Sequence, residues 1–245
     1  MAELGKDRPV IFFDQLGCGR SEADIDTTMI TVENYVKQVE QLRTALGIED
    51  FYLYGHSWGT MLGMDYYLKY PDNIKAMILA SPALSAPRWS EDAKELIATL
   101  PDSIQSAIQI ATDSNAFDTS EYEHAVNVFY EKYVIRKKPW DANIDSTFQQ
   151  ANLNVYGYMW GPSEFTATGT LANYDRTGVL GQINIPTLYV CGEYDEARPA
   201  TLEYFQSLTP GSKLAVIENA AHVTMHDNPE KNNEVIRNFL NELEK

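Results

Sequence analysis

The chain has 245 residues, enough for one α/β domain or two small domains with a sizeable core. Hydrophobic residues make up 44% of it and charged residues 22%, which is typical of a soluble globular protein. No segment approaches the roughly 20 apolar residues of a membrane-spanning helix, so no membrane association is expected. The 19 basic and 35 acidic residues give a net charge of −16, which argues against binding to nucleic acid and favours cationic ligands.

The cysteine content indicates neither disulfides nor a metal site. Cys18 and Cys191 are too few for a disulfide framework, and their spacing matches no zinc motif. The opening residues do not resemble a signal peptide, and a reducing cytoplasm is the expected location. No metal and no organic cofactor is implied.

The first part of the chain alternates predicted strands and helices. Short apolar runs predict strands, and apolar residues at helical spacing predict helices. The strands are expected at residues 9–13, 51–54 and 76–80. The helices are expected at residues 31–46, with Gly47 as C-cap, and at 58–70, ended by Pro71.

The pattern changes between Pro82 and Asp175. This stretch has no clear strand, and helices are expected near residues 91–99, 103–111 and 121–133, so it is interpreted as an inserted helical lid. Alternation then resumes, with strands at 186–191 and 213–217 and helices at 200–207 and 230–243. The predicted fold is α/β, a mostly parallel sheet covered on both faces, with core segments 1–81 and 176–245 and the lid at 82–175.

The pentapeptide Gly55-His56-Ser57-Trp58-Gly59 lies directly between a predicted strand and a predicted helix. This is the context of the Gly-x-Ser-x-Gly nucleophile elbow, in which a strained turn exposes the serine hydroxyl above the sheet edge. Ser57 is therefore the candidate nucleophile. The alternative is an ordinary tight turn.

Four histidines compete as the base for this serine. His222 follows the last predicted strand and precedes the last helix, as the serine, acid, histidine order requires. His226, four residues on, is the rival candidate. His56 is expected to pack inside the elbow, and His124 to lie on the surface of a lid helix.

The acid should follow the penultimate strand. The loop there reads Gly192-Glu193-Tyr194-Asp195-Glu196, and Asp195 is the candidate for orienting the imidazole. Glu193 and Glu196 are local rivals for this role. Helix capping is the alternative role for Asp195.

Four further strings accompany the elbow: Asp-Gln-Leu-Gly-Cys-Gly-Arg-Ser at 14–21, Tyr-Met-Trp-Gly-Pro-Ser-Glu-Phe at 158–165, Gly-Glu-Tyr-Asp-Glu at 192–196 and His-Val-Thr-Met at 222–225. Together they resemble the proline iminopeptidase (prolyl aminopeptidase) family of α/β-hydrolases, over nearly the whole chain. The resemblance implies removal of an N-terminal residue, usually proline, from short peptides with a free N-terminus. It also implies that Glu164 and Glu196 hold the free amine, which is largely protonated at neutral pH.

The role of Glu164 has a simpler alternative, a solvated lid residue. Aromatic residues of the lid could wall a pocket for an apolar ring or form the lid core: Trp140, Tyr156, Tyr158, Trp160 and Phe165. Of these, Tyr156 is the candidate substrate contact.

The chain departs from the resemblance at its start. Family members carry a strand and a His-Gly-Gly-Pro-Gly loop before the segment that begins here, and that loop supplies an oxyanion donor opposite the N–H of Trp58. Three alternatives follow. The strands at 9–13 and 51–54 pair directly, or a second chain of a homo-oligomer supplies a strand between them, or the sequence is a fragment of a longer protein. With Trp58 N–H as the remaining donor, turnover is expected to fall by ~10²–10³.

Two other functions stay open on the sequence alone. A carboxylesterase or amidase of the same fold would use the triad without the glutamate pair. A catalytically silent or truncated α/β-hydrolase would be a binding protein.

Overall fold

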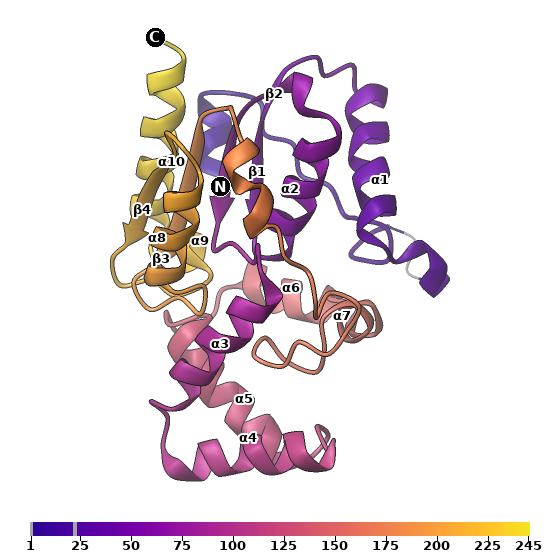
Figure 1. The fold of residues 1–245 in the computed structure, drawn as a ribbon, viewed down its shortest axis with the longest axis vertical. Helices are drawn as coiled ribbons and strands as arrows, with labels where there is room; N and C mark the ends of the chain where they lie inside the picture. The colour runs from indigo at the N-terminus through magenta and orange to yellow at the C-terminus, as the bar shows by residue number, and fades with distance from the viewer. Residues whose placement is uncertain (1, 22–23) are drawn as a thin grey trace.

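The structure, a computed structural model, describes residues 2–21 and 24–245. Its centre is a sheet of four parallel strands in the order β1-β2-β3-β4, with helices on both faces (Figure 1). The strands are β1 (Phe51–His56), β2 (Ile74–Ala80), β3 (Thr187–Gly192) and β4 (Lys213–Ile217). The predicted α/β fold with a parallel sheet is confirmed.

Alternating side chains of β2 divide the core between the two faces of the sheet. Met77 and Leu79 pack in the cluster formed with α1, α2 and α8, whereas Ile78 and Ala80 pack with α10 and the 3₁₀ helix η1. The covering elements are α1 (Val32–Ala45), α2 (Trp58–Lys69), α8 (Pro199–Leu208), α10 (Pro229–Leu243) and η1 (Ala2–Lys6). In the described part of the chain, no helix has the length and apolar character needed to cross a bilayer.

Local signals set the helix ends much as predicted. The Thr31 hydroxyl caps α1 by accepting from the Asn34 N–H at 3.2 Å, and Gly47 follows its last turn with φ 64°. Pro71 follows α2 and opens a short 3₁₀ helix. The remaining 3₁₀ helices and the one-turn helix before α10 are η2 (Thr27–Met29), η3 (Pro71–Asn73), η4 (Thr177–Gln182) and α9 (Thr224–Asp227).

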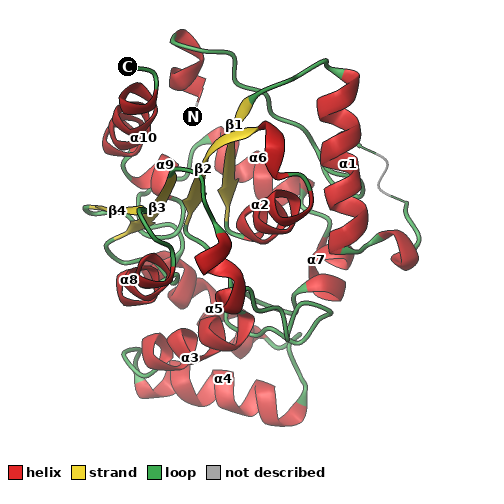
Figure 2. Cartoon of the chain, turned by 45° about the horizontal axis from the view of Figure 1, so that its top comes forward, coloured by secondary structure: helices red, strands yellow, loops and turns green. Residues whose placement is uncertain are grey.

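Residues 82–175, called the helical insertion below, lie at the carboxyl ends of the strands (Figure 2). All of them are described, and they contain no strand beyond two isolated bridges. The helices are α3 (Ala86–Ile97), α4 (Asp102–Ser114), α5 (Ser120–Tyr133), α6 (Ala142–Gln150) and α7 (Leu153–Met159). Most of them share a separate apolar cluster, in which Phe129 and Ala125 are fully buried.

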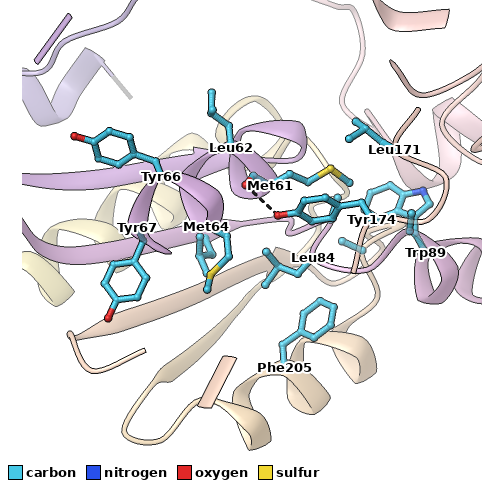
Figure 3. Packing of buried hydrophobic residues seen from close by; sticks show 14 of the residues in the cluster. Met61, Leu62, Met64, Tyr66, Tyr67, Leu84, Trp89, Leu171, Tyr174 and Phe205 are labelled. Carbon is cyan, nitrogen blue, oxygen red and sulfur yellow. Dashed lines mark hydrogen bonds between the residues drawn. The ribbon is translucent and has the colours of Figure 1, made fainter. Parts of the chain in front are cut away.

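The largest apolar cluster joins the insertion to one face of the sheet. Met61 of α2 lies among Leu84, Trp89, Leu171 and Tyr174, which all belong to the insertion (Figure 3). The Tyr174 hydroxyl donates to the Met61 carbonyl at 3.1 Å. The insertion is thus packed against the same helix that follows Ser57.

The predicted strand at residues 9–13 is wrong. The segment has no regular secondary structure and pairs with no strand of the described chain, and Ile11, Phe12 and Phe13 are 53%, 67% and 40% exposed. A strand requires a neighbour to satisfy its backbone groups, and β1 pairs only with β2 within the described residues. Direct pairing of this segment with β1 therefore does not occur, and the outer edge of β1 is left without a ladder.

At the end of β3, the backbone of residues 220–221 approaches Gly192 so closely that we expect no side chain to be tolerated there. A Cβ there would lie 2.3 Å from the carbonyl oxygens of both Ala220 and Ala221. Gly192→Ala should lower the free energy of unfolding by roughly 1–3 kcal/mol, measured by urea denaturation. Gly178→Ala, where a Cβ would meet nothing within 4 Å, is the matched control. Equal stability of the two variants would contradict this packing argument.

Candidate active site

Ser57 occupies a sharp turn between β1 and α2. Its φ of 53° and ψ of −121° are unfavourable for a residue with a Cβ, and its N–H donates to the Ala80 carbonyl at 3.0 Å. Gly55 makes the turn possible, because a Cβ there would lie 2.4 Å from the Gly59 carbonyl oxygen. The motif thus lies in the strand, turn and helix context of a nucleophile elbow.

The structure brings Asp195 and His222 together. The Nδ1 atom of His222 lies 2.9 Å from Oδ1 of Asp195, and both side chains are almost fully buried. Burial opposes protonation of His222, but the charge and hydrogen bond of Asp195, with the charge of Glu164, outweigh it and raise the imidazole pKa. The imidazolium form is therefore stabilised at this position.

Hydrogen-bond donors surround the Asp195 carboxylate. The N–H groups of Gly192 and Ala197 donate to it at 3.1 and 2.8 Å, and the Ser81 hydroxyl donates at 2.7 Å. With His222 Nδ1, both carboxylate oxygens are satisfied. These donors hold the Asp195 carboxyl group in one orientation.

No hydrogen bond joins Ser57 and His222 in the described part of the chain. Nε2 of His222 is buried and has no hydrogen-bond partner among the described residues. The rings of His56 and Trp89 enclose the imidazole, with centroids at 4.8 and 5.5 Å. Such hydrogen bonds between nucleophile and base are often loose until substrate is bound.

The rival residues lie in other environments. Nδ1 of His226, in α9, lies 3.4 Å from the Asp141 carboxylate, on the side of the helical insertion. His56 contacts the His222 carbonyl oxygen through Nε2 at 2.9 Å, and His124 is exposed on α5. Glu193 is exposed and accepts from the backbone N–H of Asn219.

Glu164 and Glu196 are close neighbours of this centre. Glu196 is 2% exposed, and neither of its carboxylate oxygens has a hydrogen-bond partner in the described chain. Its Oε1 lies 3.8 Å from His222 Nδ1. Burial first, and then the charges of Glu164 and Asp195, raise the pKa of Glu196 well above its usual value. Burial also raises the pKa of Glu164, against the influence of His222 and Tyr156.

Two tyrosines face the glutamate pair. Burial and the charge of Glu164 raise the pKa values of Tyr130 and Tyr156 well above the ordinary value. The Tyr130 hydroxyl accepts from the backbone N–H of Glu164 at 3.4 Å. The Tyr156 hydroxyl lies near the Glu164 carboxylate but makes no hydrogen bond of ordinary geometry within the described residues.

An apolar cavity of about 190 Å³ extends from Ser57 into the insertion. Its wall includes Trp89, Tyr156 and Trp160, and Glu164 lies at the same cavity, whereas Glu196 is not part of the wall. The indole N–H groups of Trp89 and Trp160 both donate to the Glu164 carbonyl, at 2.8 and 3.1 Å. These bonds fix the segment that carries Glu164 relative to the aromatic wall.

The other candidate aromatic residues do not line this cavity. Trp140 stacks on Phe148 with centroids 5.3 Å apart, and Phe165 belongs to the core of the insertion. Tyr158 is 40% exposed. Sequence reasoning missed Trp89, because nothing in its helical surroundings distinguishes a cavity residue from a core residue.

The end of α5 is bonded to the loop that carries His222. The N–H groups of His222 and Val223 donate to the carbonyls of Tyr133 and Val134 at 3.2 and 3.0 Å. The Asp227 carboxylate accepts from N–H groups on both sides of this contact, those of residues 136 and 137 and that of residue 221. The insertion and the histidine loop therefore share one hydrogen-bonded junction.

Comparison with known proteins agrees with the geometry. The sequence model of a family described as alpha/beta hydrolase fold matches residues 1–229. The proline iminopeptidase of Heyndrickxia coagulans is 43% identical over 243 residues, which cover 98% of this chain and 84% of that protein.

Solved structures give the same result. The crystal structure of VinJ superposes with a TM-score of 0.88 at 32% identity, covering 94% of this chain and 79% of that one. The proline iminopeptidase of Mycobacterium smegmatis superposes with a TM-score of 0.85 at 30% identity, covering 94% and 78%. The chain therefore belongs to the proline iminopeptidase family of α/β-hydrolases and is a serine hydrolase.

Proposed function

We propose that the protein is a serine aminopeptidase that releases an N-terminal residue, preferentially proline, from short peptides. The observation that carries this proposal is the Glu196 carboxylate, which is buried beside Glu164 with no donor on either oxygen. An unpaired buried carboxylate is costly, because burial removes water without supplying a partner. Such a group suits a site whose missing cation arrives with the substrate.

The α-ammonium group of a peptide supplies that cation. Its pKa near ~8 keeps it largely protonated at neutral pH, and the two N–H bonds of a protonated N-terminal proline offer one donor to each glutamate. Because Glu164 and Ser57 line the same cavity, an amine held at Glu164 places the first residue of the peptide between them. The proposed site therefore places the first peptide bond of the substrate at Ser57, so that one residue is released.

The shape of the cavity favours a compact apolar first residue. Trp89, Trp160 and Met61 offer flat or flexible apolar surfaces around about 190 Å³ of space. The methylene groups of a pyrrolidine ring are apolar, and the ring is rigid and compact, so it orders with little loss of entropy. In this proposal the helical insertion at 82–175 is the lid over a core built from segments 1–81 and 176–245.

The proposed reaction follows the serine hydrolase sequence. Ser57 Oγ attacks the scissile carbonyl while His222 Nε2 takes its proton, and Asp195 holds the imidazole and stabilises its charge. The backbone N–H of Trp58, at the start of α2, donates to the oxyanion. His222 then protonates the leaving amine, and a water molecule hydrolyses the acyl-enzyme by the reverse proton path.

The first test concerns the triad. Ser57→Ala and His222→Ala should each lower kcat/KM on a proline arylamide by at least ~10⁴-fold, because members of the triad act as a unit. Circular dichroism would check that the variants fold. His226→Ala is the matched control and should stay within a few-fold of the parent. Loss of activity in His226→Ala with retention in His222→Ala would overturn the base assignment.

The second test concerns recognition of the amine. Glu164→Gln and Glu196→Gln should lower kcat/KM on the proline arylamide by ~10²–10³-fold, since each leaves a buried ammonium partly unpaired. Hydrolysis of a p-nitrophenyl ester without an amine should change far less. Glu193→Gln, an exposed glutamate of the same loop, is the control.

Acetylation of the substrate provides the complementary measurement for the same site. The parent enzyme should hydrolyse acetyl-proline arylamide poorly, because the amide has no charge to pair with the glutamates. Equal rates on the free and acetylated substrates would rule out the aminopeptidase and favour the esterase.

A third test measures the cost of the unpaired charge. The folded state raises the pKa of Glu196, so the carboxylate destabilises the fold increasingly as the pH rises from the unfolded value, near ~4.3, through the folded one. Glu196→Gln should therefore increase the free energy of unfolding at pH 7, and this gain should vanish near pH 4. Urea denaturation at both pH values checks this. A destabilised variant at pH 7 would show that the carboxylate is structural.

A further inference from the structure

Ser81 is a strained, fully buried residue directly after β2. Its φ of 47° lies in the left-handed region, which a serine occupies only at some cost, and its exposed fraction is 0%. The N–H of Ser81 donates to the Val190 carbonyl at 2.6 Å, which fixes its backbone between β2 and β3. Glycine would tolerate this φ better, so the hydroxyl itself calls for an explanation.

The Ser81 hydroxyl lies within hydrogen-bond distance of two acceptors. Oγ is 2.7 Å from Asp195 Oδ2 and 2.9 Å from the His222 carbonyl oxygen. A hydroxyl has one proton to donate, and an ionised carboxylate is the stronger acceptor. The Ser81 proton is therefore directed to Asp195.

The His222 carbonyl has its own donor. Nε2 of His56 lies 2.9 Å from it, and a carbonyl oxygen only accepts, so this nitrogen carries the hydrogen. Burial, with the proximity of His222, lowers the pKa of His56 to about 4, which keeps it neutral. His56 thus binds the main chain of the residue whose side chain is the proposed base.

These contacts connect the carboxyl ends of all four strands. His56 ends β1, Ser81 follows β2, and Asp195 and His222 lie in the loops after β3 and β4. We infer that Ser81 is a positioning residue that aims the Asp195 carboxylate at His222, while His56 holds the main chain of His222. This inference rests on the proposed triad.

The hydrogen bond from Ser81 also reduces the negative charge on Asp195 that acts on the His222 imidazole. The titratable groups facing the imidazole are Asp195, Glu196, Glu164 and the neutral His56. The buried Cys191 thiol, near Asp195, stays protonated because burial raises its pKa. Removing the Ser81 proton concentrates charge on Asp195 and raises the His222 pKa further. The base must be neutral to act, so the acid limb of kcat/KM moves to higher pH.

The experiment compares Ser81→Ala with Ser81→Gly. Both remove the hydroxyl, but glycine also relieves the strained backbone, so the pair separates the two roles of this residue. On a proline arylamide, kcat should fall about tenfold or more in both variants, with KM within about twofold of the parent. The acid limb should shift to higher pH in both.

A spectroscopic measurement tests the same inference without turnover. The Nδ1 proton of His222 should give a low-field resonance in the Ser57→Ala background, and this resonance should move when Ser81→Gly is added. If Ser81→Ala fails to fold, the kinetics and the resonance are measured on Ser81→Gly alone. His56→Phe should lower kcat, while His124→Phe, on the exposed face of α5, is its matched control and should not.

The outcomes separate this inference from the proposed function. A parent-like kcat, pH profile and resonance in Ser81→Gly would show that Ser81 serves the backbone alone and would overturn the inference. Retention of activity in Ser57→Ala would instead overturn the proposed function, and the resonance would still report on Ser81.

Discussion

The buried carboxyl group of Asp195 is the constraint on which the loops at the carboxyl edge of the sheet depend. A carboxylate removed from water is tolerable only where hydrogen-bond donors converge on it. Here the donors come from its own loop, from Ser81 and from His222. To bring them together, the histidine loop approaches so closely that Gly192 has no room for a Cβ, and Ser81 adopts a left-handed backbone. Local strain and close packing thus accompany the burial of a single carboxyl group.

The neighbouring residue shows the opposite solution. Glu196 is as deeply buried as Asp195, yet its carboxylate has no donor in the described chain. Two adjacent carboxyl groups of one loop therefore differ in whether the described chain supplies their hydrogen-bond donors. The protein itself supplies hydrogen-bond donors to Asp195, whereas in the proposed function the substrate supplies them to Glu196. The difference explains how one loop could serve both the geometry of the base and the recognition of a cation.

The sequence predicted most of the fold, because hydrophobic period and turn residues are local signals. It also predicted that Asp195 and His222 meet, since the loops after parallel strands open at one edge of the sheet. The strand predicted at 9–13 was wrong because a strand forms only beside a partner strand, and an apolar run does not specify a partner. Ser81 was missed for a related reason. Serine is common in turns, and only the three-dimensional structure shows its hydroxyl against a buried carboxylate. The position of a serine directly after a strand was the one available signal.

The junction between α5 and the histidine loop restricts how the site can open. The main chain of His222 is bonded to the carbonyl of Tyr133, and Asp227 joins the two segments through its carboxylate. Moving this end of the insertion away from the sheet would pull the imidazole out of register with Asp195. In the proposed function, a peptide would therefore reach Ser57 away from this junction, on the side where Gln15 and Asn152 border the cavity. The fold thereby couples the placement of the proposed base to one end of the insertion.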